Sequence, residues 1–174
     1  MSQFFQIDNN QFTIEIEKPL VFSIKNFLKE DNYEKVNNQI EILGNILKKK
    51  DLKYLNSKEG KFKEFENNYI EIKKLKNLVF SENFKKFFCV NLKKYFYKNI
   101  FLKKLFFLLP YSIIKKKISI NFEISFMFNG SFLAPHTDSR KKLFTLMLYF
   151  PKDQNLSKLG TSFYESKISN PLNK

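Results

Sequence analysis

The spacing of apolar residues changes at Lys117, and this change constrains the fold more than any other feature of the sequence. Before it, apolar residues recur three or four positions apart, which places them on one face of a helix. After it, every second residue is apolar from Ile118 to Phe128, as in a strand that buries one face. The chain must therefore combine helices with at least one long strand. The helical series consists of Phe84, Phe87, Phe88, Leu92, Tyr95 and Phe96.

The residues before this helix predict two strands and two further helices. Alternation over Gln11–Glu17 and a short apolar run over Leu20–Ile24 indicate strands. A helix of about 18 residues is expected from Asn32, ending at three lysines that suit a helix C-terminus. A second helix is expected over Tyr69–Phe80, and the third begins near Ser81. The apolar positions of the first helix are Val36, Ile40, Ile42, Leu43, Ile46 and Leu47.

The order of these elements predicts the fold class. Residues 51–68 are polar and are expected to be a connection, and Leu143–Phe150 is expected to be the next strand. Strands, then helices, then strands are typical of an α+β fold rather than a doubly wound sheet. The length of 174 residues fits one domain, in which residues 1–117 form the N-terminal strands and helices and residues 118–174 begin a second strand-rich part.

Cysteine content and hydropathy limit the cellular setting. A single cysteine, Cys89, excludes an internal disulfide, and its apolar neighbours indicate a buried structural thiol. The N-terminus lacks the features of a signal peptide. The longest apolar run, Ile100–Leu109, is interrupted by two lysines and is shorter than the roughly 18 residues of a membrane span. We therefore expect a cytoplasmic protein without a membrane span.

The net charge of +14 comes from the middle of the chain. Residues 48–117 hold 20 Lys and 6 acidic residues, whereas the remainder holds 11 basic and 11 acidic residues. Such an excess is compatible with a non-catalytic basic module that binds nucleic acid or anionic surfaces. A lysine-rich composition on solvated helix faces also explains the excess and is the favoured interpretation. The single arginine argues against nucleic acid, because arginine is the residue that clamps phosphates and reads guanine.

The one histidine of the chain, His136, lies two residues before Asp138. In an extended segment these two side chains point to the same side, so an imidazole and a carboxylate can converge on one point. They would be two of the three ligands in the facial triad that holds non-haem Fe(II). A pair at this spacing also occurs by chance, so its flanking residues matter.

Those flanks resemble the 2-oxoglutarate-dependent dioxygenases, and in particular the prolyl-hydroxylase-type members. Residues 128–139 are similar to the family's strand, glycine turn, short apolar step and His-Thr-Asp sequence. Residues 141–151 look like its next strand, and residues 159–164 look like the glycine turn and strand that follow. The specific resemblance covers about residues 118–165.

The resemblance implies a double-stranded β-helix, or jelly roll, with Fe(II), 2-oxoglutarate and O₂ at its open end and ascorbate as reductant. His136 and Asp138 would be the first two iron ligands. Tyr149 first, and Thr145 second, would hydrogen-bond the far carboxylate of 2-oxoglutarate, although a tyrosine of the core is an equally good interpretation of Tyr149. Arg140 and Lys141 would meet an anionic substrate, unless they are solvated loop charges. The substrate itself, a small molecule or a peptide, is not predicted.

The sequence departs from the family in one respect. The family's third ligand is a second histidine several strands further on, and these 174 residues contain one histidine. Three or four barrel strands are expected from Ile118 onward, where eight are needed. We therefore expect either a fragment of an ordinary dioxygenase, which the intact flanks of the motif favour, or a degenerate descendant reused for binding. In both cases these residues alone should have little or no oxygenase activity.

Overall fold

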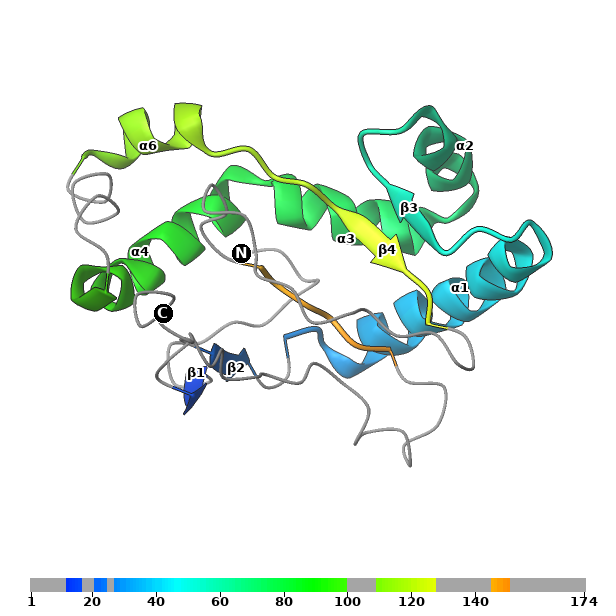
Figure 1. The fold of residues 1–174 in the computed structure, drawn as a ribbon, viewed down its shortest axis with the longest axis horizontal. Coiled ribbons are helices and arrows are strands. Elements are labelled where there is room, and N and C mark those ends of the chain that lie inside the picture. Colours follow the sequence, from blue (N-terminus) through cyan, green and yellow to red (C-terminus); the bar gives the residue numbers. More distant parts are fainter. Residues whose placement is uncertain (1–11, 17–20, 25–26, 100–108, 128–144, 151–174) are drawn as a thin grey trace, which may run out of the picture. The chain divides into compact units, whose positions relative to one another are not determined.

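A computed structural model of the chain describes residues 12–16, 21–24, 27–99, 109–127 and 145–150 (Figure 1). The chain divides into two compact units, Met1–Phe126 and Met127–Lys174. The helices and strands of the described residues all belong to the first unit. They combine antiparallel strands with helices, as expected for an α+β fold.

The two strands predicted near the N-terminus are confirmed. β1 (Phe12–Ile16) and β2 (Val21–Ile24) form an antiparallel pair. Phe12 lies opposite Ile24, and the register shifts between Ile14 and Ile16. Both segments are rich in β-branched and aromatic residues, which have high β-propensity.

The first predicted helix is confirmed as α1 (Glu30–Lys49), which begins two residues before the expected start. Acidic residues in its first turn and lysines in its last turn both stabilise the helix, because they interact favourably with the helix dipole. Val36, Leu43 and Leu47 are buried, whereas Ile42 is 54% exposed. Ile42, one of the apolar positions of this helix, thus lies outside the buried face, since the position one residue before Leu43 is about 100° away around the helix.

The end of α1 is a Schellman motif. The Leu52 N–H donates to the Leu47 carbonyl over 2.9 Å, and the Asp51 N–H donates to the Lys48 carbonyl over 3.2 Å. Asp51 has a φ of 52°, in the left-handed region that this motif requires. Leu52 packs against the core beside Leu47, which is the hydrophobic contact that accompanies such a cap.

The expected connection over residues 51–68 is instead largely ordered. It forms β3 (Tyr54–Asn56) and α2 (Gly60–Asn68). β3 pairs antiparallel with β4 (Glu123–Ser125), with Leu55 opposite Ile124. Hydrogen bonds of 2.8 Å from Ser57 N–H to the Phe122 carbonyl and from Phe126 N–H to the Lys53 carbonyl extend this ladder at both ends.

The remaining helices follow one another along the chain. α3 (Ile70–Phe80) and α4 (Glu82–Asn99) confirm the second and third predicted helices. α6 (Tyr111–Lys117) follows Pro110 and was not predicted. α3 packs against α1, α2 and α4, and α6 packs against α4. No helix in the described parts of the chain combines the length and apolar character needed to cross a bilayer.

The side chain of Gln39 caps the N-terminus of α3 from a distance. Its Oε1 accepts the backbone N–H of Glu71 over 2.9 Å and that of Ile72 over 3.2 Å. Tyr69, the residue before α3, provides no side-chain cap of its own. A residue of α1 therefore satisfies two of the backbone donors that every helix start leaves open.

One apolar cluster joins five of these elements. It brings together α1, β3, α2, α3 and β4, and the Phe62 ring meets the Phe122 ring edge to face at 5.8 Å. An ion pair of 2.8 Å between Lys76 and Glu66 also joins α3 to α2. The buried members of the cluster are Leu43, Leu47, Leu55, Phe62, Phe65, Ile72 and Ile124.

The long strand expected over Ile118–Phe128 is only partly formed. Exposure does alternate from residue 118 to residue 127, as the sequence predicts, but only β4 within this range is a strand. Its partner β3 has three residues, so the ladder has little backbone to pair with. Residues 145–150 of the expected Leu143–Phe150 strand are likewise not in a strand, and the jelly roll stays a prediction.

Candidate functional site

Four of the six predicted site residues lie outside the described residues. These are His136, Asp138, Arg140 and Lys141, which fall within residues 128–144. Their roles therefore stay predictions. Within the ranges that the structure describes, no three side chains of His, Cys, Asp and Glu come together in a way that could hold a metal.

Thr145 and Tyr149 lie in the described segment 145–150. Exposure alternates along it, with Thr145, Met147 and Tyr149 exposed and the three residues between and after them half-buried. The Tyr149 hydroxyl contacts Met147 Sδ at 3.4 Å, which places these two side chains on the same side. A thioether is a weak hydrogen-bond acceptor. The Tyr149 hydroxyl therefore lies beside the Met147 thioether at an exposed position.

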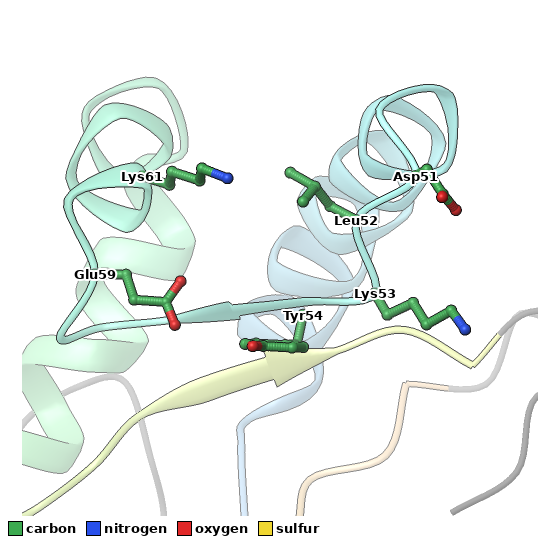
Figure 2. A pocket seen from close by; sticks show the side chains of 6 residues that line it. All are labelled: Asp51, Leu52, Lys53, Tyr54, Glu59 and Lys61. Atoms are coloured by element: carbon green, nitrogen blue, oxygen red, sulfur yellow. The ribbon is translucent and has the colours of Figure 1, made fainter.

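A pocket of about 280 Å³ lies where α1, β3 and α2 meet, and sequence reasoning did not find it (Figure 2). Lys61, from the first turn of α2, and Leu52 point toward one another across it. Its volume is near the lower limit of small-molecule pockets. Two lysines and two carboxylates give it no net charge preference. It is lined by Asp51, Leu52, Lys53, Tyr54, Glu59 and Lys61.

A polar cluster lies where α6 meets α4. Tyr111 donates its hydroxyl to the backbone carbonyl and to Oε2 of Glu82, with 3.2 Å to each. Desolvation, followed by the negative charge of Glu82, raises the pKa of Tyr111 to about 12. The hydrogen bond from Lys85, 3.0 Å from Glu82 Oε1, lowers the pKa of Glu82. A carboxylate that accepts these bonds holds α6 in place, and a tyrosine with a raised pKa is a poor general base at neutral pH.

The prediction of a buried thiol at Cys89 is confirmed. Burial raises its pKa, because the thiolate loses more solvation than the thiol. Nucleophilic cysteines need the opposite shift. Cys89 is therefore a packing residue of α4, together with the buried Phe84 and Phe88.

Comparison with known proteins adds no relative to this picture. The chain matches no protein-family model, and neither the curated proteins nor the solved structures contain a match.

Proposed function

We propose that this chain provides two iron ligands of a 2-oxoglutarate-dependent oxygenase that hydroxylates a C–H bond of a small molecule or peptide. The observation that carries the proposal is the sequence Pro135-His136-Thr137-Asp138, placed between the turn sequence Asn129-Gly130 and the apolar run Leu143–Phe150. The reaction class couples oxidative decarboxylation of 2-oxoglutarate to succinate with hydroxylation of the substrate.

The donor set suits the metal. An imidazole nitrogen and a carboxylate oxygen are the ligand types of the facial triad, and one intervening residue lets both side chains reach the same point from extended backbone. The metal, when bound, provides the open positions at which 2-oxoglutarate and O₂ react. His136 and Asp138 fix its place, and the protein orients the organic cosubstrate around it.

Tyr149 and Thr145 supply the hydroxyl groups for the far carboxylate of 2-oxoglutarate. Both are exposed, and both follow the proposed ligands by fewer than 14 residues. Hydrogen bonds to a charged group contribute roughly 1.5–3 kcal/mol, so the loss of such a bond should weaken binding about 10- to 100-fold. The neighbouring cations Arg140 and Lys141 suit an acidic group on the substrate.

The triad needs a third ligand, and His136 is the one histidine of the chain. Free imidazole has the missing donor atom. We therefore expect added imidazole to strengthen the binding of Fe(II) and 2-oxoglutarate by the 174-residue chain. The anaerobic charge-transfer absorption of the Fe(II)–2-oxoglutarate chelate reports this binding directly.

Four variants make this titration specific. His136→Ala and Asp138→Ala should each abolish the absorption. Tyr149→Phe should weaken the binding of 2-oxoglutarate but leave the affinity for Fe(II) unchanged. Asp153→Ala, which removes an acid 15 residues after Asp138, is the matched control and should behave as wild type. Equal absorption from the wild type and His136→Ala, with or without imidazole, would refute the proposal.

A further inference from the structure

One side of α6 packs against α4, and the residues on that side show which side faces outward. Ile114 is 4% exposed. The Tyr111 hydroxyl bonds to Glu82 at the start of α4. Since Tyr111 and Ile114 lie three residues apart, they share the inner side of the helix.

The outward side of α6 combines aliphatic and cationic side chains. Ile113 is 43% exposed, and Lys116 and Lys117, which follow it by three and four residues, are exposed on the same side. Leu109, two residues before the helix begins, is 39% exposed. We call Leu109, Ile113, Lys116 and Lys117 the outer face of α6.

The sequence around this face has charge of one sign. Residues 83–122 contain 10 Lys and no acidic residue, and all 17 acidic residues of the chain lie outside this stretch of 40. Lysine-rich composition explains many lysines, but it does not explain the absence of glutamate and aspartate. In the described structure Glu82 contacts Tyr111 on the inner side of α6, whereas the charged side chains of α6 itself, Lys115, Lys116 and Lys117, are all cationic and attract anions.

We propose that the outer face of α6 docks on an anionic phospholipid surface. Lysines attract the headgroups, and exposed aliphatic side chains enter the boundary with the acyl chains, so the two residue types of this face match the two layers of a membrane surface. Nucleic acid fits less well, because it selects arginine and stacking aromatic residues, and this face offers neither. The inference concerns binding at a surface and is independent of the iron site.

Sedimentation of the full chain with vesicles tests the proposal. Wild type should bind vesicles that contain phosphatidylserine, release them as salt is raised, and ignore vesicles of phosphatidylcholine alone. Each lysine near an anionic surface contributes about 1 kcal/mol, or about fivefold in affinity, so Lys116→Gln with Lys117→Gln should weaken binding roughly 30-fold. Adding Ile113→Ser should weaken it further.

A matched control is available on α1 and the residues that follow it. Ile42→Ser with Lys49→Gln and Lys53→Gln removes the same charge and one equally exposed isoleucine, and should bind vesicles as wild type does. Circular dichroism of both triple variants establishes that each is folded. The proposal is overturned if the control loses as much binding as the α6 variant, if phosphatidylcholine vesicles bind equally well, or if wild type binds no vesicles. It is equally overturned if single-stranded DNA binds more tightly than the anionic vesicles do.

Discussion

Replacing Gly44 by alanine should destabilise the protein, although alanine is the better helix former. A Cβ at this position of α1 would lie 2.8 Å from Cε1 and 3.0 Å from Cδ1 of the Phe126 ring. Ordinary carbon contacts are about 3.5–4.0 Å. The ring cannot simply retreat with its backbone, because the Phe126 N–H is bonded to the Lys53 carbonyl at 2.8 Å. It must rotate away from the helix or push it aside.

The magnitude follows from two opposing effects. Overpacking a core position costs roughly 1–3 kcal/mol. Replacing glycine by alanine inside a helix stabilises the folded state by about 1 kcal/mol, because alanine has the higher helix propensity. We therefore expect Gly44→Ala to lower the free energy of unfolding by about 1 kcal/mol, within a range from nearly none to about 2 kcal/mol.

A double-mutant cycle separates the two effects. In a Phe126→Ala background the clash is absent, so Gly44→Ala should become stabilising by about 1 kcal/mol. Urea denaturation followed by circular dichroism measures all four proteins. Gly60→Ala is the control, since nothing lies within 4 Å of a Cβ at that position. The reasoning is refuted if Gly44→Ala changes stability by the same amount in both backgrounds.

Three further predictions test other contacts. Gln39→Ala should cost about 1–2 kcal/mol because it uncaps α3, whereas Asn38→Ala, on the exposed side of the same helix, should cost almost nothing in the same urea assay. Asp51→Gly should raise stability by roughly 0.5–1 kcal/mol, since glycine relieves the left-handed strain and removes a negative charge from a helix C-terminus; an unchanged or lower urea midpoint contradicts this. The pKa of Tyr111 is raised to about 12, so the folded state binds the phenolic proton more tightly than the unfolded state does. The contribution of Tyr111 to the free energy of unfolding is therefore complete below about pH 10 and is lost between about pH 10 and 12. The free energy of unfolding is measured against pH for the wild type and for Tyr111→Phe, and the difference between the two profiles separates this loss from the titration of the lysines. Identical profiles would contradict the prediction.

Elements with a dense apolar pattern could be predicted from the sequence. α1 and α3 each bury at least three side chains at helical spacing. Apolar residues therefore recur often enough along these helices for the helical period to be recognised in the sequence. Near the N-terminus, the alternation of Gln11–Glu17 and the apolar run Leu20–Ile24 likewise predict strands. α2 buries only Phe62 and Phe65, β3 only Leu55, and α6 only Ile114. Such sparse signals do not distinguish a short element from a connection.

The contacts that hold these short elements could not be predicted, because they depend on tertiary structure. The cap on α3 comes from a glutamine 32 residues earlier, and the partner of β4 lies in a segment that reads as polar. The close approach of Phe126 to Gly44 likewise joins residues 82 positions apart. Sequence periodicity reports which side of an element is apolar but not which element covers it.

Metal ligation and membrane docking would be recognised in the sequence for different physical reasons. A ligand pair needs two specific side chains at one spacing, so the proposed motif at His136 can be recognised from the sequence alone. Surface docking needs only a net positive charge and a few exposed aliphatic residues. A solvated helix can have the same composition, so only the orientation of α6 in the structure distinguishes the two. The two sites share no residue, so loss of Fe(II) binding in His136→Ala should leave vesicle binding unchanged, and loss of vesicle binding in the α6 variant should leave the Fe(II) chelate unchanged. A variant that disturbed both would indicate a folding defect rather than a lost site, and only the separation of the two assays allows either function to be assigned.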